Sequence, residues 1–143
     1  MRVVIQRVQK ASVEVENSIV SSIKQGIVVL LGIENNDNEN DIEWLTNKIS
    51  QLRIFNDNNN IMNKSIIDIN GDIIIISQFT LHALTKKGNR PSYIKAAKSE
   101  YAKKMYNKFL ASFEKKINKK PGSGIFGADM LVKIENDGPV TIF

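Results

Sequence analysis

The chain has 143 residues, a formal net charge of +5, no cysteine and a single histidine. This length fits one domain over residues 1–143, and the composition excludes disulfide bonds, thiolate catalysis and metal sites built from several Cys or His ligands. No apolar run approaches the roughly 18 residues that a membrane span needs, and the charged, alternating N-terminus lacks the pattern of a signal peptide. We therefore expect a soluble, cytoplasmic protein that uses no metal and no cofactor.

The first half of the chain has the pattern of several strands followed by a helix. Apolar and polar side chains alternate in the first two strands, whereas the last is continuously apolar, which is typical of a strand buried on both faces. Apolar residues at helical spacing from Ile42 to Leu52 predict a helix over about 39–53. The strands are expected at residues 2–8, 12–16, 19–23 and 27–33.

The second half begins with turns and another buried strand. Polar runs at residues 56–60 and 70–72 predict turns, and the four isoleucines 73–76 predict the strand. Pro91 can open a short helix, and Ser99 can cap a longer one with an apolar stripe typical of a core-facing helix. This order predicts a single α/β domain with a largely buried sheet and helices packed on one side. The closing strands are expected at residues 125–135 and 139–143.

The net charge is unevenly distributed along the sequence. Residues 86–120 contain twelve basic and two acidic residues, a net charge of +10, so the rest of the chain carries −5. Such a segment is typical of a protein that binds a polyanion, because phosphate contacts dominate affinity for nucleic acids. A lysine-rich helix face exposed to water gives the same pattern, and charge alone does not separate the two interpretations.

Arg7 and His82 each allow two interpretations. Arg7 shares a strand face with Val3 and Ile5, so it either extends to water from the edge of the core or clamps carbonyls or a carboxylate inside it. His82 either points into a cleft or is a loop histidine without a role, which is the favoured interpretation. As the only imidazole, it leaves no credible Ser-His-Asp or Cys-His catalytic set.

Two short polar segments directly adjoin apolar runs. Residues 77–81, Ser-Gln-Phe-Thr-Leu, follow the four isoleucines and place hydroxyls, an amide and free backbone N–H groups at a strand end, where ligands bind in open α/β sheets. Alternatively, Thr80 continues a β-prone stretch and Ser77 caps it. Gly138 and Pro139 form either an ordinary turn or a cis peptide bond, which would bring two carbonyls side by side.

Together these segments resemble the D-aminoacyl-tRNA deacylase family over essentially the whole chain. The two most specific motifs are SQFTL at residues 77–81 and NDGPVT at residues 136–141. The animal-type paralogue has a PQATL-like first motif and a TNGPYTH-like second one, so this sequence is similar to the standard bacterial and eukaryotic branch. Further matching residues are Gln6-Arg7-Val8, Ala11-Ser12-Val13, Leu30-Leu31-Gly32, Arg53-Ile54-Phe55, Met62-Asn63, Arg90-Pro91-Ser92 and Phe126-Gly127-Ala128-Asp129-Met130.

The resemblance implies a hydrolase of carboxylic esters, which cleaves the bond joining a D-amino acid, or glycine, to the terminal adenosine of tRNA. It also implies a homodimer with a layered, barrel-like deacylase fold, in which a cis Gly138-Pro139 pair reaches into the partner's site and Arg7 braces it. The carbonyls of Gly138 and Pro139 would face the substrate's α-carbon, where the side chain of an L-amino acid would collide.

The same resemblance assigns the remaining site residues. The backbone N–H groups of Phe79 and Thr80 would support a developing oxyanion. Thr80 as a nucleophile would lack a base; the family pattern points instead to the terminal 2′-hydroxyl of the tRNA activating water. The basic segment at 86–120 would face the acceptor stem. The catalytic wall would consist of Ser77, Gln78, Phe79 and Thr80, and the adenosine pocket of Phe126, Gly127, Ala128 and Met130.

Two other functions fit parts of the pattern. The +10 segment also suits a non-catalytic RNA-binding module, and the same fold suits a hydrolase of small esters such as free D-amino acid esters. The chain ends two residues after Thr141, at Ile142-Phe143, and this short tail leaves room for a difference at the dimer edge.

Overall fold

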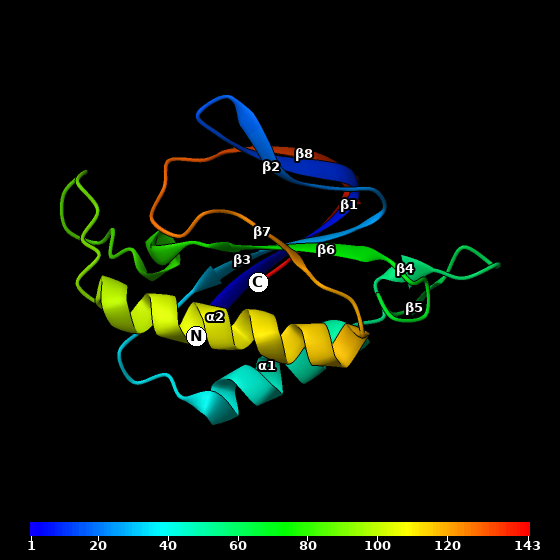
Figure 1. The fold of residues 1–143 in the computed structure, drawn as a ribbon, viewed down its shortest axis with the longest axis horizontal. Coiled ribbons are helices and arrows are strands. Elements are labelled where there is room, and N and C mark those ends of the chain that lie inside the picture. Colours follow the sequence, from blue (N-terminus) through cyan, green and yellow to red (C-terminus); the bar gives the residue numbers. More distant parts are fainter.

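A computed structural model of the chain describes all residues, 1–143, as a curved sheet with two long helices on one of its faces (Figure 1). The helices lie side by side, so the prediction that they pack on one side is confirmed. The elements, in chain order, are β1 (Arg2–Val15), β2 (Ser18–Ile23), β3 (Gly26–Gly32), α1 (Glu39–Gln51), β4 (Phe55–Asn56), β5 (Met62–Lys64), β6 (Asp72–Ser77), the 3₁₀ helix η1 (Phe79–His82), α2 (Ser99–Ile117), β7 (Gly122–Ser123) and β8 (Leu131–Ile142).

The sheet is built around β1. This strand of 14 residues pairs antiparallel with β2, β3 and β8, while β3 pairs in parallel with β6 and β6 with β7. The resulting order is β2-β1-β3-β6-β7, with β8 on β1. Register shifts along the β1–β8 pair increase the local bend of the strands. Because β1 has three partners and bends, the sheet curls on itself, and the predicted layered, barrel-like α/β fold is confirmed.

Two apolar clusters lie on opposite faces of the sheet. The larger lies between the sheet and the helices, where Val29 and Ile75 meet Phe109 of α2. The smaller contains Val28 and Ile74 and is covered by β1, β2 and β8. Neighbouring residues of β3 and β6 thus belong to different clusters, which explains why these strands are continuously apolar.

The start and end of α1 follow from its sequence. Asn38 accepts a hydrogen bond from Asn40 N at 2.9 Å, and Asp41 accepts one from Asn38 N at 2.8 Å, which together satisfy free backbone donors at the start. The helix ends at Gln51 because Leu52 adopts an extended conformation, so the predicted helix is confirmed with a shorter end. Neither helix has both the length and the apolar content that crossing a membrane requires.

The segment before α2 differs from the prediction. Pro91 opens no helix, because residues 84–92 form a loop whose ends are joined by backbone hydrogen bonds between Leu84 and Ser92. Ser99 is the first residue of α2 rather than its cap. Lys98 occupies the cap position and makes no side-chain capping bond.

The closing strands also differ. Residues 125–130 form a turn, and the two predicted closing strands are one continuous strand, β8. The first two predicted strands likewise merge into β1. In both cases the pairing continues across register shifts, which interrupt the alternation of side chains without ending the strand. The predicted turn at residues 56–60 is present as the tip of the short β4–β5 hairpin. The two strands of this hairpin were not predicted, since strands this short show no alternation.

Candidate active site

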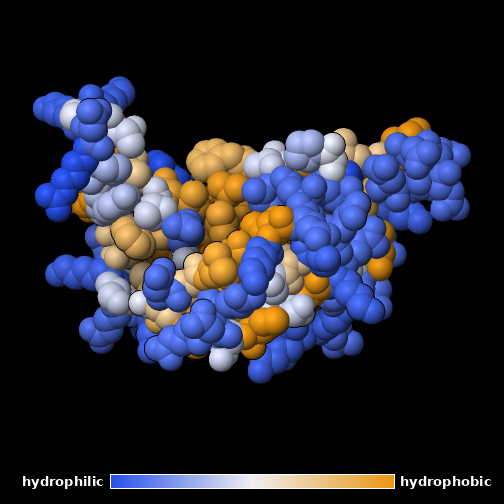
Figure 2. All heavy atoms as spheres, turned by 90° about the horizontal axis from the view of Figure 1, so that it is seen from above, coloured by the Kyte–Doolittle hydropathy of each residue, from blue (hydrophilic) through white to orange (hydrophobic).

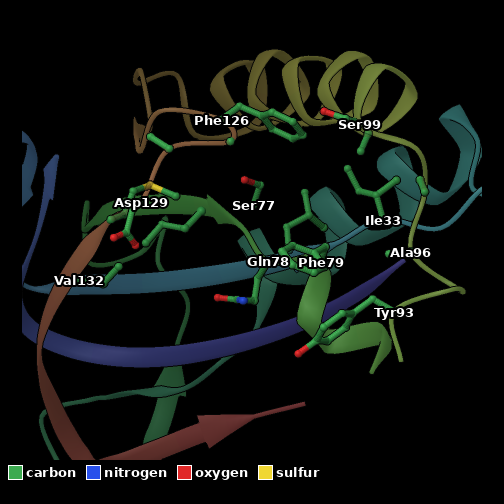
Figure 3. Close-up of a pocket in the computed structure, with 17 residues that line it drawn as sticks. Ile33, Ser77, Gln78, Phe79, Tyr93, Ala96, Ser99, Phe126, Asp129 and Val132 are labelled. Carbon is green, nitrogen blue, oxygen red and sulfur yellow. The ribbon is translucent and has the colours of Figure 1, made fainter. Parts of the chain in front are cut away.

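A cavity of about 650 Å³ opens beside the end of β6 (Figure 3). Its walls come from segments far apart in the sequence: the end of β6 with the start of η1, the segment leading into α2, and the turn between β7 and β8. Twelve of the 17 lining residues are hydrophobic. A volume and lining of this kind are usual for pockets that bind small molecules or nucleosides.

The first wall is the predicted segment Ser77-Gln78-Phe79. β6 ends at Ser77, and Gln78 continues the contact with β3 by donating its backbone N–H to Leu31 O at 2.7 Å. η1 then turns the chain, so the Phe79 ring lies at the cavity, 57% exposed. It meets Tyr93 edge-on, with 5.0 Å between the ring centroids. Figure 3 shows both side chains at the cavity. All three predicted residues therefore line the cavity.

Thr80 lies next to this wall but does not line the cavity. Its hydroxyl accepts a hydrogen bond from Gln78 Nε2 at 2.5 Å and is bonded to no carboxylate, amine or imidazole. The backbone N–H groups of Phe79 and Thr80 begin η1 and have no acceptor within the protein, as is usual for the first amides of a helix. This wall thus provides two free backbone donors and no activated hydroxyl.

The opposite wall is the turn between β7 and β8. Its four predicted residues, Phe126, Gly127, Ala128 and Met130, all line the cavity. The Phe126 ring rests against Tyr106 with 5.8 Å between the ring centroids. Gly127 has a φ of +80° and no atom within 4 Å of the position of a Cβ, so glycine fits the turn and leaves the space beside Phe126 open.

Tyr106 supports this wall from the core. Its hydroxyl donates a hydrogen bond to Ile75 O at 2.6 Å. Burial raises the pKa of Tyr106 to about 12, against a smaller lowering effect of Ser123. The phenol therefore stays protonated at neutral pH and remains a donor, so Phe126 rests on a side chain that is fixed to β6.

Arg7 holds the second specific motif, residues 136–141. Arg7 is buried, donates a hydrogen bond from Nη1 to Ile54 O at 2.6 Å, and its Nε lies 2.9 Å from Asp137 Oδ2. The side-chain amide of Asn136 donates to Arg7 O at 2.8 Å. Arg7 therefore clamps a carbonyl and a carboxylate within the protein instead of extending to water.

Gly138 and Pro139 do not contribute to the cavity of their own chain. The peptide bond between them is cis, as the family resemblance implied. Both residues are exposed, and neither they nor Arg7 line the cavity. β8 leaves the cavity at Val132, and Gly138 follows six residues later, at most about 20 Å further on at about 3.3 Å per residue. The predicted residues thus form two separate sets in one chain.

The sequence matches the family model of D-Tyr-tRNA(Tyr) deacylase over residues 4–143. The chain belongs to this family. Curated relatives named D-aminoacyl-tRNA deacylase include one from Flavobacterium johnsoniae, which is 60% identical over 142 residues, and one from Christiangramia forsetii, which is 58% identical over 142 residues. Each match covers 99% of this chain and 95% of the relative.

Two solved structures are similar to this member of the deacylase family. The c-Myc DNA Unwinding Element Binding Protein has a TM-score of 0.93 and 42% identity, with 99% of this chain and 96% of that chain covered. A probable eukaryotic D-amino acid tRNA deacylase has a TM-score of 0.84 and 16% identity, with 98% and 96% covered. At the lower identity, the similarity concerns the fold alone.

In this deacylase-family chain, His82 occupies a place that neither interpretation of the sequence predicted. It lies in η1, is completely buried, and neither ring nitrogen has a hydrogen-bond partner. It does not line the cavity. A Cβ on Gly32 would lie 3.0 Å from His82 Cδ2, so the ring packs tightly against the backbone of β3. His82 is a packing residue and not a loop histidine.

Three residues whose side chains carry polar groups line the cavity without having been predicted as site residues: Tyr93, Ser99 and Asp129. Asp129 lies within the matched motif Phe-Gly-Ala-Asp-Met, so the motif itself could have indicated it. Tyr93 and Ser99 reach the cavity because residues 84–92 fold back on themselves, and no local pattern indicates that path.

Proposed function

We propose that this chain hydrolyses the ester bond of D-aminoacyl-tRNA and releases the free D-amino acid and tRNA, the reaction for which its relatives are named. One observation carries the proposal. Ser77, Gln78 and Phe79 face the turn at residues 126–130 across a single cavity. Its volume, about 650 Å³, suits a nucleoside that bears an amino acid.

The nucleoside end of this substrate fits the turn between β7 and β8. A flat base binds in an apolar slot by stacking on an aromatic ring. Phe126 supplies the ring, Gly127 and Ala128 leave room beside it, and Met130 adds a polarisable contact. These four residues form the proposed adenosine pocket.

The ester carbonyl would lie against Ser77, Gln78, Phe79 and Thr80. When water attacks, negative charge develops on the carbonyl oxygen, and the free N–H groups of Phe79 and Thr80 stabilise it. The 2′-hydroxyl of the terminal ribose activates the water by orienting and polarising it. As the water oxygen bonds to the carbonyl carbon, the bond between that carbon and the ribose oxygen breaks, and the proton that the water loses passes to the departing ribose oxygen. A Thr80 hydroxyl bonded only to the amide of Gln78 is consistent with this substrate-assisted route.

Chiral selection would come from Gly138 and Pro139 of the partner in a homodimer. Their carbonyls would face the α-carbon, where a D-amino acid or glycine presents hydrogen and the side chain of an L-amino acid collides. The exposure of both residues and their separation from the cavity of their own chain support a role across subunits. Glycyl-tRNA mischarged on tRNA(Ala) is then a second substrate, and translation proofreading places the enzyme in the cytoplasm.

Hydrolysis of D-tyrosyl-tRNA and L-tyrosyl-tRNA, measured side by side, tests the proposed function. The D-ester should be cleaved and the L-ester should persist, because only the D-form avoids the collision. Equal rates on the two esters would rule out chiral proofreading.

A non-catalytic nucleic-acid-binding module is the second candidate. The +10 segment favours it, and so does the name of the solved structure at 42% identity, a DNA unwinding element binding protein. It predicts binding of uncharged tRNA with no cleavage of either tyrosyl ester. A small-ester hydrolase would instead prefer free D-amino acid esters to D-tyrosyl-tRNA.

A further inference from the structure

The basic segment at residues 86–120 divides into two parts. In and after α2, three of its lysines are neutralised by carboxylates of α1 and β6 through the ion pairs Lys108–Glu39, Lys116–Glu43 and Lys119–Asp72. Residues 86–98, by contrast, contain five basic residues and no acidic one. None of these five cations forms an ion pair. Four lysines in and after α2 also lack an ion pair, but Glu100 and Glu114 lie on the same helix, so the larger unneutralised positive charge lies before α2.

Three of these five cations lie on a projecting loop, residues 84–92, which we call the basic finger. Backbone hydrogen bonds close its base, from Leu84 N to Ser92 O at 2.8 Å and from Ser92 N to Leu84 O at 3.1 Å. At its tip, Gly88 has a φ of +69° and no atom within 4 Å of the position of a Cβ. Figure 1 shows this loop beyond the body of the fold, and Figure 2 shows that end as a hydrophilic projection. The three cations are Lys86, Lys87 and Arg90.

The base of the finger leads directly into the cavity. Tyr93 follows Ser92, lines the cavity, and meets Phe79 at an interplanar angle of 78°. The two side chains are 38% and 57% exposed. Exposed aromatic rings beside a track of cations are typical of sites for single-stranded nucleic acid, because a ring stacks on a base and the cations bind phosphates.

We propose that the basic finger and Tyr93 form a second subsite, which binds the single-stranded nucleotides that precede the terminal adenosine of the tRNA. This subsite rests on the proposed function, in which the terminal aminoacyl-adenosine occupies the cavity. The three finger cations contact phosphates, and Tyr93 stacks on the base next to the adenosine. From Ser92 to Gly88 the finger spans four residues and therefore reaches at most about 14 Å from its base.

These contacts make the subsite tolerant of nucleotide sequence. Phosphates are the same in every nucleotide, and every base has a face on which an aromatic ring can stack. One finger therefore serves tRNAs that differ in sequence, while the cavity selects the amino acid.

The decisive experiment compares D-tyrosyl-tRNA with D-tyrosyl-adenosine, which fills the cavity but lacks the preceding nucleotides. One variant combines Lys86→Ala, Lys87→Ala and Arg90→Ala, none of which changes a residue that lines the cavity. We expect its kcat/KM to fall at least about tenfold on the tRNA and to stay unchanged on the nucleoside. Because this variant no longer binds three phosphates, its plot of log kcat/KM against log salt should be less steep by about two units.

A matched control removes the same charge outside the basic segment. It combines Lys24→Ala, Lys48→Ala and Lys64→Ala, three lysines that form no ion pair. We expect this control to keep most of the wild-type kcat/KM on the tRNA and to keep the wild-type salt dependence.

Two substitutions test the role of Tyr93: one removes the aromatic ring, and the other keeps it. Tyr93→Ala should lower kcat/KM on D-tyrosyl-tRNA by about 5- to 150-fold, the usual effect of removing one base–ring stack. Tyr93→Phe keeps the ring and should restore the rate. A structural role alone would lower kcat/KM equally on the tRNA and on D-tyrosyl-adenosine.

Two results would overturn the second subsite. One is an equal kcat/KM for the finger variant and the lysine control on D-tyrosyl-tRNA. The other is an equal decrease on both substrates, which would locate the effect in the cavity. Binding of uncharged tRNA, measured by fluorescence anisotropy, tests the second subsite independently of the deacylase activity. Wild-type protein that binds tRNA more tightly than the finger variant but cleaves neither substrate would contradict the deacylase function and support the subsite.

Discussion

Thr80 is the side chain of the candidate site that most resembles a nucleophile. Its hydroxyl is bonded to the amide of Gln78, and His82, the only imidazole, is buried without a partner. A hydroxyl without an adjacent base is a weak nucleophile at neutral pH. The side chains of the site can therefore position a substrate, and its backbone N–H groups can donate hydrogen bonds to it, but no side chain is activated to attack it.

Thr80→Ala should keep the rate of D-tyrosyl-tRNA hydrolysis within about tenfold, since removing a true nucleophile costs on the order of 10⁶-fold. Single-turnover rates at saturating enzyme measure the effect, and Thr80→Ser, which retains the hydroxyl, is the matched control. Complete inactivity of Thr80→Ala with a wild-type thermal transition would favour a protein nucleophile.

The N-terminal amine has a structural role of its own. The Met1 ammonium forms a buried ion pair with Asp37, whose second carboxylate oxygen accepts a hydrogen bond from Glu34 N at 2.7 Å. Tyr101 of α2 donates its hydroxyl to the backbone carbonyl of Asp37. These contacts fix the loop between β3 and α1, and Ile33 at the start of that loop lines the cavity.

A Gly-Ser extension before Met1 would turn this ammonium into an amide and leave the Asp37 carboxylate, only 5% exposed, without its cation. Breaking a buried pair in this way costs roughly 3–5 kcal/mol, so the free energy of unfolding in urea should fall by a comparable amount. The same two residues added after Phe143 provide the control. Equal stability of the two fusions would show that the ion pair contributes nothing.

Among the elements, α2 links the core to the cavity. Its apolar stripe buries Met105, Phe109 and Phe113 against the sheet, while Tyr106 bonds to β6 and supports Phe126. α2 therefore supports the wall of the proposed adenosine pocket through Tyr106, and its residues Ser99 and Ala102 line the same cavity.

The raised pKa of Tyr106 predicts how this helix responds to alkaline pH. Burial favours the protonated phenol, so the unfolded chain ionises first, near the ordinary pKa of 10.0. Stability from this group is complete below pH 10 and is lost as the pH rises towards 12. The decrease amounts to roughly 3 kcal/mol for two pKa units. Tyr106→Phe cannot ionise, so its urea midpoint should fall less than that of the wild type between pH 10 and 12; parallel curves would contradict this assignment.

The sequence predicts an element well when the pattern that forms the element lies within its own residues. The strands β3 and β6 and the helix α1 follow from apolar patterns within their own residues, and the two cavity walls follow from motifs that include residues 77–79 and 126–130. Tyr93 and Ser99 reach the cavity through the fold of residues 84–92, which depends on a backbone contact between Leu84 and Ser92. Contacts of this kind leave no periodic signal in the sequence.

For the whole molecule, the central fact is that the two specific motifs lie apart. Residues 77–79 line the cavity, whereas Gly138 and Pro139 project from β8, held by Arg7 and Asp137. A single chain therefore presents a cavity at one place and, at another, residues 137–140 of β8, which have no partner on β1 and which we call the Gly-Pro loop. In a symmetric dimer each loop can complete the partner's cavity, because a two-fold axis exchanges the two surfaces.

Subunit mixing tests this arrangement. Gly138→Ala should inactivate the loop, because Gly138 has a φ of +114° and a Cβ would lie 2.9 Å from Val140 Cγ2 and 3.1 Å from Arg7 Nη2. A displacement of such a loop by about 1 Å can cost on the order of 10²-fold in rate. Ala128→Trp should inactivate the cavity by filling it. Each variant alone is then expected to be nearly inactive.

A heterodimer of the two variants contains one site with an intact cavity and an intact loop, and one site with both defects. After unfolding and refolding an equimolar mixture, random pairing should restore about a quarter of the wild-type activity on D-tyrosyl-tRNA, because half of the dimers carry one working site. If each chain completed its own cavity, no pairing could combine the two intact parts, and the mixture would remain as inactive as its components. Restored activity that disappears when the variants are refolded separately and then mixed would place the loop in the partner's site.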